Sequence, residues 1–130
     1  MGQDRLKVLV VDDEEGIVDF MQKILRARGF DAVGAADGQA AVDLYDKEHP
    51  QIALIDIQLG YSRLTGLDVL EHIRKSSPET LCFMITRITD EAAVQKARDL
   101  GAIHYLLKPL DTREWLAAVQ DAAQTIKARG

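Results

Sequence analysis

The sequence has little of several features that define other classes of protein. It contains one cysteine among 130 residues, so no internal disulfide can form and a reducing compartment is the simpler setting. That residue, Cys82, lies in an apolar run without a cationic neighbour, so we expect it to pack in the core rather than act as a nucleophile. The net charge is −5 and no run of Lys and Arg forms a basic stripe, which argues against direct nucleic-acid binding.

Long apolar runs are also missing. No stretch approaches the ~20 apolar residues that a membrane-spanning helix needs, and the first residues, Met-Gly-Gln-Asp-Arg, do not have the pattern of a signal peptide. No low-complexity segment, internal repeat or Gly/Ser linker divides the chain, and 47% of its residues are hydrophobic. We therefore expect one globular domain in the cytoplasm, without a membrane association.

Short apolar runs alternate with helical patterns along the whole chain. The sequence predicts strands at residues 6–11, 31–35, 52–57, 80–85 and 102–107. A first helix carries Ile17, Met21, Ile24 and Leu25 on one face and ends before Gly29. Further helices are predicted at residues 40–48, 67–75, 91–100, with Asp90 as its N-cap, and 111–129.

These five strand–helix units predict a doubly wound α/β sandwich. Strands that are apolar along their length, rather than alternating, are typical of a parallel sheet buried on both faces. Each crossover is long enough to hold a helix and is expected to be right-handed. In such sheets the functional site lies outside the carboxyl ends of the strands, so those ends are where chemistry is expected.

Polar side chains follow four of the five predicted strands. Asp12 and Asp13 follow the first, Asp56 lies at the carboxyl end of the third, Thr86 follows the fourth and Lys108 the fifth. Asp12 and Asp13 alone could cap the next helix, but together the five side chains form one acidic rim with a hydroxyl and an ammonium. Mg²⁺ relieves the repulsion between such carboxylates and leaves sites for phosphate oxygens. An aspartate carboxylate can also form an acyl phosphate, so Asp56 is the expected phosphate acceptor.

Five segments carry a family resemblance. They resemble, in order and spacing, the receiver domain of two-component response regulators, of the CheY-like superfamily, over about residues 5–125; residues 126–130 are then the end of the last helix or the start of a linker. The segments are Val-Leu-Val-Val-Asp-Asp-Glu-Glu (8–15), Ala-Leu-Ile-Asp-Ile (53–57), Gly-Leu-Asp-Val-Leu (66–70), Met-Ile-Thr (84–86) and Gly-Ala-Ile-His-Tyr-Leu-Leu-Lys-Pro (101–109). The expected fold is a three-layer, flavodoxin-like (βα)5 sandwich with strand order 2-1-3-4-5.

The resemblance implies a signalling switch rather than an enzyme with its own substrate. Asp56 takes a phosphoryl group from a sensor histidine kinase or a phosphotransfer protein, and the domain assists both its own phosphorylation and its own dephosphorylation. Mg²⁺ is held by Asp13, Asp56 and the backbone carbonyl of Gln58, with help from Asp12.

The resemblance also implies how the signal leaves the acceptor. Lys108 pairs with the phosphoryl group, and a cis peptide precedes Pro109. Thr86 and Tyr105 move as a switch that alters the face made by the fourth helix, fifth strand and fifth helix. That face is read by a downstream effector or a fused output domain, and a homodimer on phosphorylation is also compatible with this family. From the sequence alone, Tyr105 is equally well explained as a half-buried aromatic residue.

Two departures from the family pattern stand out. Gly60 stands where the family usually has Pro, and the loop 58–65 is about two residues longer, with Tyr61, Ser62 and Arg63 near its middle. Arg87 follows the switch threonine, where a small residue is usual. It could pair with the phosphoryl group or an acidic residue, block access, or be solvated.

Two other functions stay open. The departures make a phosphorylation-independent interaction module on the same fold conceivable. An aspartate-nucleophile phosphatase usually needs an acid two residues after the nucleophile, but Gln58 occupies that position.

Overall fold

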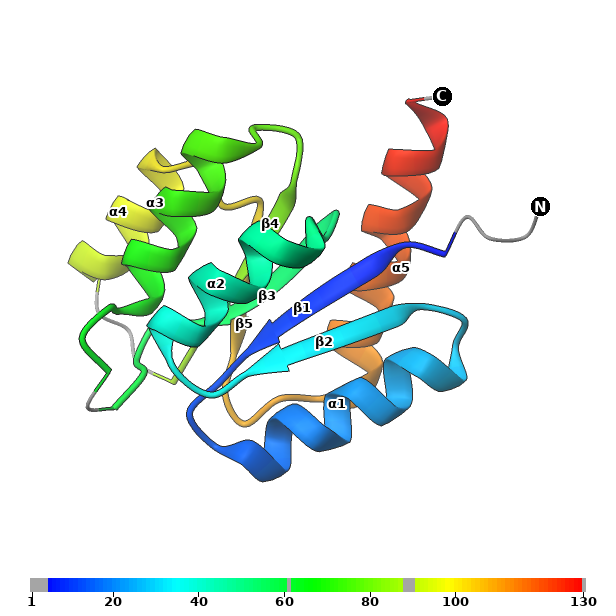
Figure 1. Ribbon diagram of the computed structural model, residues 1–130, viewed down its shortest axis with the longest axis horizontal. Helices are drawn as coiled ribbons and strands as arrows, with labels where there is room; N and C mark the ends of the chain where they lie inside the picture. The colour runs from blue at the N-terminus through cyan, green and yellow to red at the C-terminus, as the bar shows by residue number, and fades with distance from the viewer. Residues whose placement is uncertain (1–4, 61, 88–90, 130) are drawn as a thin grey trace.

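The computed structural model describes residues 5–60, 62–87 and 91–129 (Figure 1). Within them, strands and helices alternate as predicted, and every predicted boundary lies within two residues of the observed one. The strands are β1 (Lys7–Val11), β2 (Asp31–Ala35), β3 (Ile52–Asp56), β4 (Leu81–Thr86) and β5 (His104–Leu107). The helices are α1 (Glu15–Ala27), α2 (Gly38–Glu48), α3 (Gly66–Ser76), α4 (Glu91–Asp99) and α5 (Thr112–Ala128).

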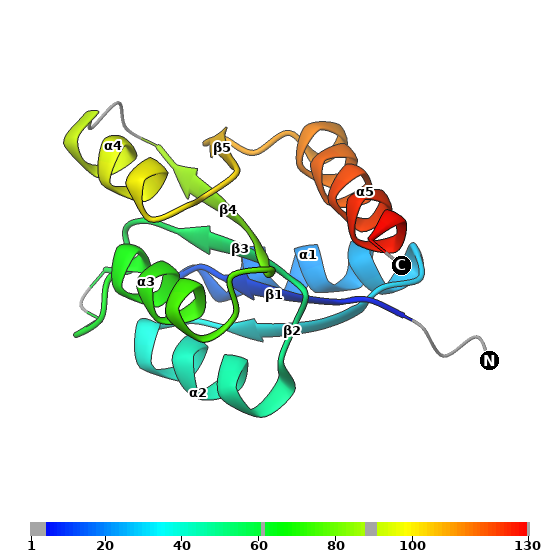
Figure 2. The same ribbon diagram turned by 90° about the horizontal axis from the view of Figure 1, so that it is seen from above.

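The five strands form one parallel sheet in the order β2-β1-β3-β4-β5, which confirms the predicted topology. Helices α1 and α5 cover one face of this sheet, and α2, α3 and α4 cover the other (Figure 2). Because all strands run the same way, their carboxyl ends lie at one edge, whereas the start of β1 and the end of α5 lie at the opposite end (Figure 1).

Alternate residues of the central strands belong to two different cores. Val8 and Val10 of β1 face α1 and α5, where they join Met21, Leu25 and Trp115. Their neighbours Leu9 and Val11 face the opposite side, where they join residues of α2 and α3 such as Tyr45, Val69, Leu70 and Ile73. This division is why β1 and β3 carry continuous apolar runs instead of a polar–apolar alternation.

Burial on both faces holds for the centre of the sheet but is wrong for its edge. All residues of β3 and β4 are buried, and Cys82 in β4 is fully enclosed, so burial raises the pKa of its thiol to about 12. In β5, only Leu106 is buried, and Leu107 is 58% exposed. β5 is therefore an edge strand, and part of its apolar surface stays exposed to solvent.

Side-chain caps fix where the helices begin. Asp37 accepts a hydrogen bond from the Ala40 N–H at 2.7 Å, so this residue caps α2. Thr65 and Asp68 form a capping box at the start of α3, which fixes where the loop after β3 ends. The predicted cap Asp90 lies outside the described residues. None of the helices described has both the length and the apolarity required to cross a lipid bilayer.

Candidate functional site

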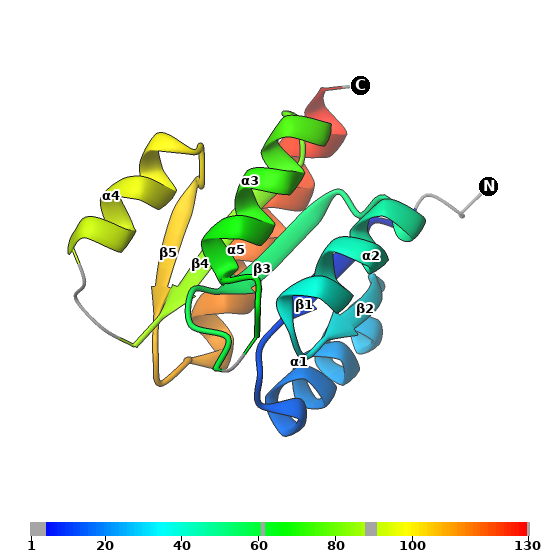
Figure 3. The same ribbon diagram turned by 60° about the vertical axis from the view of Figure 1, so that its left-hand side comes forward.

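The polar side chains predicted at the strand ends lie at one edge of the sheet. Asp12 follows β1, Asp56 ends β3, Thr86 ends β4 and Lys108 follows β5. The segments after β1, β3 and β5 lie together at that end of the molecule (Figure 3). Asp12, Asp56 and Thr86 are each at most 4% exposed, although all three are polar. Buried polar groups need partners, so this edge is built for charge and not only for packing.

Lys108 holds two of the buried carboxylates. Its Nζ donates a hydrogen bond to Asp56 Oδ2 at 2.8 Å and lies 2.9 Å from Asp12 Oδ2. The Lys108 side chain is only 8% exposed. The peptide between Lys108 and Pro109 is cis, as the resemblance implied.

Three carboxylates converge beside this lysine. Asp12, Asp13 and Asp56 each offer an oxygen, and these oxygens lie within 4.8 Å of one another. Asp12 Oδ2 is buried, and the charged group beside it is the Lys108 ammonium at 2.9 Å, so this oxygen depends on nearby positive charge. Hard carboxylate oxygens at this spacing suit Mg²⁺ or Ca²⁺ rather than zinc or copper. The donor set therefore fits the magnesium site expected from the sequence.

Burial and charge act in opposite directions on Asp56. Burial raises the pKa of Asp56, and the hydrogen bond and charge of Lys108 offset that rise only in part, so the pKa lies above its usual value. For Lys108, burial alone lowers the pKa, but its hydrogen bonds to Asp56 and Asp12 and their charges outweigh burial, so the pKa is raised. The lysine thus stays protonated and keeps a positive charge against Asp56.

The loop after β3 forms the wall of the pocket beside Asp56, which was expected from the sequence to be the acceptor. This pocket has a volume of about 560 Å³ and is lined by Asp13, Asp56, Ile57, Gln58, Leu59, Gly60, Ser62, Thr65, Leu67, Arg87 and Ala93. The Gln58 N–H donates to Asp56 Oδ1 at 3.0 Å. Of the three residues placed at the middle of the longer loop, Ser62 lines the pocket, Arg63 is exposed and Tyr61 lies outside the described residues.

Two contacts explain the unusual path of this loop. Gly60 has a φ of 58°, which proline cannot adopt, and a Cβ added there would lie 2.8 Å from Asp13 Oδ2. Ser62 Oγ accepts from the Gly38 N–H at 2.8 Å and donates to the Leu64 carbonyl at 2.7 Å. The loop is therefore tied to the start of α2 and lies close against the acidic cluster.

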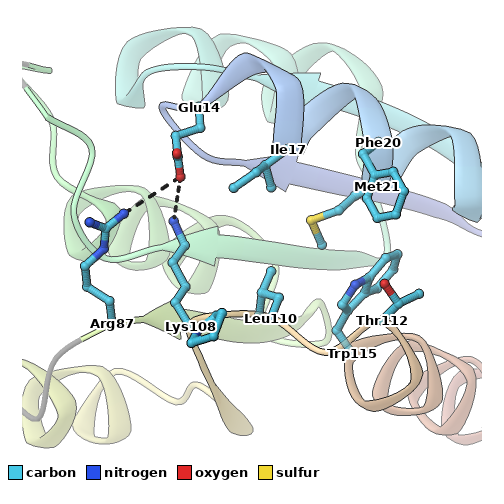
Figure 4. Close-up of a pocket in the computed structure, with 10 residues that line it drawn as sticks. Glu14, Ile17, Phe20, Met21, Arg87, Lys108, Leu110, Thr112 and Trp115 are labelled. Atoms are coloured by element: carbon cyan, nitrogen blue, oxygen red, sulfur yellow. Dashed lines mark ion pairs between the residues drawn. The ribbon is translucent and has the colours of Figure 1, made fainter.

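Arg87 and Glu14 add an outer pair of charges. The Arg87 guanidinium lies 3.8 Å from Glu14 Oε2, and the same oxygen lies 3.6 Å from Lys108 Nζ (Figure 4). The sequence analysis gave Glu14 no role, although the residue stands directly after the paired aspartates. It also lines, with Arg87 and Lys108, a groove of about 500 Å³ whose other walls are mostly apolar residues of α1, of the turn before α5 and of the start of α5 (Figure 4).

The expected switch residues share a second pocket. Thr86 and Tyr105 both line a pocket of about 420 Å³ beside α4. The Tyr105 hydroxyl is already buried and has no hydrogen-bond partner among the described residues, while the Arg98 guanidinium lies 5.6 Å from the ring centre. The tyrosine is therefore already turned partly inward in this structure.

Comparison with known proteins agrees with the fold and with the family expected from the sequence. The sequence model of the "Response regulator receiver domain" family matches residues 8–120. A curated relative, "Probable transcriptional regulator ycf27" of Porphyridium aerugineum, is 30% identical over 120 residues, or 92% of this chain. The match covers 49% of that relative, so the chain spans about half the length of the curated protein it matches.

Solved structures resemble the whole chain. The CheY-like response regulator receiver domain protein of Methanospirillum hungatei JF-1 superposes with a TM-score of 0.91 at 25% identity, covering 98% of this chain and 100% of its own. The receiver domain of NtrX from Brucella abortus superposes with a TM-score of 0.82 at 31% identity, covering 91% of this chain and 98% of its own. With its parallel sheet, its acidic rim and these matches, the chain belongs to the response regulator receiver domain family of two-component signalling.

Proposed function

We propose that this domain is a signalling switch that accepts a phosphoryl group on Asp56. The observation that carries the proposal is the position of Lys108, whose ammonium touches Asp56 and Asp12 at 2.8 and 2.9 Å beside a third carboxylate. An isolated buried lysine–aspartate pair would serve stability alone. Two further acids next to it give instead a cation site beside a nucleophile.

The chemistry follows from these contacts. An Asp56 carboxylate oxygen attacks the phosphorus of a phosphohistidine, a P–O bond forms, the P–N bond breaks, and the imidazole of the donor leaves. The Gln58 N–H and the Lys108 ammonium each hold one oxygen of Asp56, so the nucleophile is oriented before the donor arrives. Phosphoryl transfer needs mainly such positioning and charge neutralisation.

Asp13, Asp56 and the Gln58 carbonyl would hold a Mg²⁺ ion, with Asp12 acting through water. The ion would supply positive charge to the equatorial oxygens of the phosphoryl group during transfer. Asp12 keeps the other side of Lys108 occupied, so the ammonium stays beside Asp56 when that residue becomes an acyl phosphate. The donor would be a sensor histidine kinase or a phosphotransfer protein, as in the family.

The output is proposed to leave through Thr86 and Tyr105. These two residues line one pocket with Arg98 of α4 and Leu107 of β5, so a shift of Thr86 toward the phosphoryl group would change the packing of that pocket. A downstream effector or a fused output domain would then read the face made by α4, β5 and α5, and phosphorylation could also stabilise a homodimer there. The curated relative is longer than this chain and is described as a probable transcriptional regulator, which favours an output of that kind.

A second candidate is an interaction module that works without phosphorylation. It is favoured by one observation, namely that Arg87 lines the acceptor pocket and already pairs with Glu14 at 3.8 Å. An arginine fixed in that place would hinder a phosphoryl donor from reaching Asp56. An aspartate-based phosphatase remains the weakest candidate because Gln58 stands where its acid is expected.

One experiment separates the three functions. The protein is incubated with Mg²⁺ and acetyl phosphate, and its intact mass is measured over time. The switch predicts a gain of one phosphoryl group that Asp56→Asn abolishes and that Asp43→Asn, at an exposed position of α2, leaves unchanged. No gain from acetyl phosphate or from a cognate kinase would favour the interaction module, and steady release of phosphate from many substrates would favour the phosphatase.

A further inference from the structure

Arg87 is the outermost member of a row of alternating charges that ends at the acceptor. Its guanidinium lies 3.8 Å from Glu14 Oε2, and that oxygen lies 3.6 Å from Lys108 Nζ (Figure 4). Lys108 Nζ in turn lies 2.8 Å from Asp56 Oδ2. Exposure increases along the row, from 6% for the Asp56 side chain to 60% for that of Arg87. A change of charge at Asp56 is therefore felt by a side chain that is free to move.

The hold of Glu14 on Arg87 is weak. Both side chains are more than half exposed, and 3.8 Å is long for a charged hydrogen bond. Glu14 also lies within 3.6 Å of Lys108, so its charge is shared between two cations. Arg87 can therefore exchange this partner for a stronger one at little cost.

A phosphoryl group on Asp56 is such a partner. A phosphoryl group carries close to two negative charges and three acceptor oxygens, whereas the Glu14 carboxylate carries one charge. The planar guanidinium binds phosphate through two parallel N–H donors, which a lysine cannot do. Arg87 already lines the acceptor pocket with Asp56 and Asp13, and among the described residues that line this pocket it is the one cation.

Lys108 alone leaves phosphoryl oxygens to be satisfied. Its ammonium already lies 2.8, 2.9 and 3.6 Å from carboxylate oxygens of Asp56, Asp12 and Glu14, and phosphorylation replaces only the contact with Asp56. A second cation at the mouth of the pocket complements it from the solvent side.

We propose that Arg87 binds the phosphoryl group on Asp56, and that Glu14 competes with this group for Arg87. This proposal rests on the function proposed above, because it requires Asp56 to be the acceptor. Most members of the family have a small residue at position 87, so the arginine here adds a side chain that can bind the phosphoryl group. Glu14 then holds the arginine beside the pocket until a phosphoryl group is present.

The test is a titration with beryllium fluoride in the presence of Mg²⁺, since this complex mimics a phosphoryl group on a carboxylate without covalent chemistry. Binding is followed by calorimetry and by the fluorescence of Trp115, the single tryptophan, which lines the groove beside Lys108. The variants are Arg87→Ala, Arg87→Lys, Glu14→Gln and the double variant Glu14→Gln/Arg87→Ala. Arg63→Ala is the control, because Arg63 is an exposed arginine of the loop between β3 and α3 that does not line the pocket.

Arg87→Ala is expected to weaken beryllium fluoride binding by roughly five- to tenfold, and Arg87→Lys by less, because lysine keeps the charge but not the paired donors. Glu14→Gln is expected to strengthen binding about twofold, and this gain should shrink when Arg87 is absent. Mg²⁺ alone should bind Arg87→Ala at least as tightly as it binds the wild type, because a nearby cation has been removed. A merely structural role would instead weaken both ligands together.

Equal beryllium fluoride affinity in Arg87→Ala, Arg63→Ala and the wild type would refute the role of Arg87 and leave the acceptor assignment intact. If Glu14→Gln strengthens beryllium fluoride binding equally with and without Arg87, the competition between Glu14 and the phosphoryl group for Arg87 is refuted, since Glu14 would then act through Lys108 alone. The acceptor assignment would again stay intact. If the wild type itself binds no beryllium fluoride and Asp56→Asn changes nothing, both this proposal and the proposed function fail.

Discussion

Replacing Lys108 by alanine tests whether the charge of this lysine stabilises the buried carboxylates of the acidic rim. The substitution removes a buried ammonium from between Asp56 and Asp12, whose side chains are 6% and 0% exposed. Removing one member of a buried ion pair commonly costs about 3–5 kcal/mol, because the other member is left without a partner. Asp13 is exposed and admits solvent to the cluster, so we expect a loss near the lower end, about 3 kcal/mol.

This loss converts into a measurable melting shift. For a chain of 130 residues the entropy of unfolding is about 0.27 kcal/mol per kelvin, so 3 kcal/mol lowers the Tm by roughly 11 °C. A domain with an ordinary stability of about 5–15 kcal/mol remains folded at 25 °C after such a loss. Lys108→Ala should therefore be folded but much less heat-stable, while its response to phosphorylation is weakened.

Two conditions should rescue the variant. Without Lys108, the pKa of Asp56 rises further, because the lysine contributes the hydrogen bond and charge that lower it. A folded pKa above the unfolded one means that folding takes up protons, so stability increases as pH falls through the folded pKa. The difference in Tm between variant and wild type should thus narrow on acidification from pH 7. Millimolar Mg²⁺ should also raise the Tm of the variant more than that of the wild type.

The assay is thermal unfolding followed by circular dichroism at several pH values, with and without Mg²⁺. Lys7→Ala is the control, because Lys7 pairs with Glu48 and both side chains are partly exposed, so a much smaller decrease is expected. A Tm for Lys108→Ala no lower than that of Lys7→Ala, with no extra effect of Mg²⁺, would show that the lysine does not hold the rim together.

Three further predictions, the last with a comparison variant, concern the Asp56 carboxylate, the Tyr105 hydroxyl and the close packing at Gly66. Asp56→Asn should raise the Tm at pH 7 without Mg²⁺, because the raised pKa means that burial disfavours the charged form; this gain should fade as pH falls through the folded pKa. Tyr105→Phe should raise stability by up to about 1 kcal/mol in urea unfolding, since it removes a buried hydroxyl that has no hydrogen-bond partner among the described residues. Gly66→Ala should cost more than about 3 kcal/mol, because its Cβ would lie 2.0 Å from the Asp56 carbonyl oxygen, whereas Gly16→Ala in α1, with nothing within 4 Å, should be neutral or stabilising.

The fold could be predicted because its signals are local. Apolar runs, helical spacing and glycines after helices place each element within two residues, and parallel strands then bring their carboxyl ends to one edge. The burial of β5 could not be predicted in this way. An apolar run has the same appearance in a central strand and in an edge strand. The strand order decides which residues, such as Leu107, stay exposed, and that order came from the family resemblance and not from the apolar pattern.

The rim could be predicted for the same reason, since Asp12, Asp56 and Lys108 each end or follow a strand and the backbone alone brings them together. The pairing of Arg87 with Glu14 could not. It joins the residue after β4 to the residue before α1, and it depends on where two long, exposed side chains turn. Sequence reasoning therefore finds the charged residues that the strand ends bring together. It misses the pairs that form only because long side chains turn toward each other. Such side-chain pairs can differ between members of one family while the sheet stays the same. In this chain the difference is Arg87, which lines the acceptor pocket.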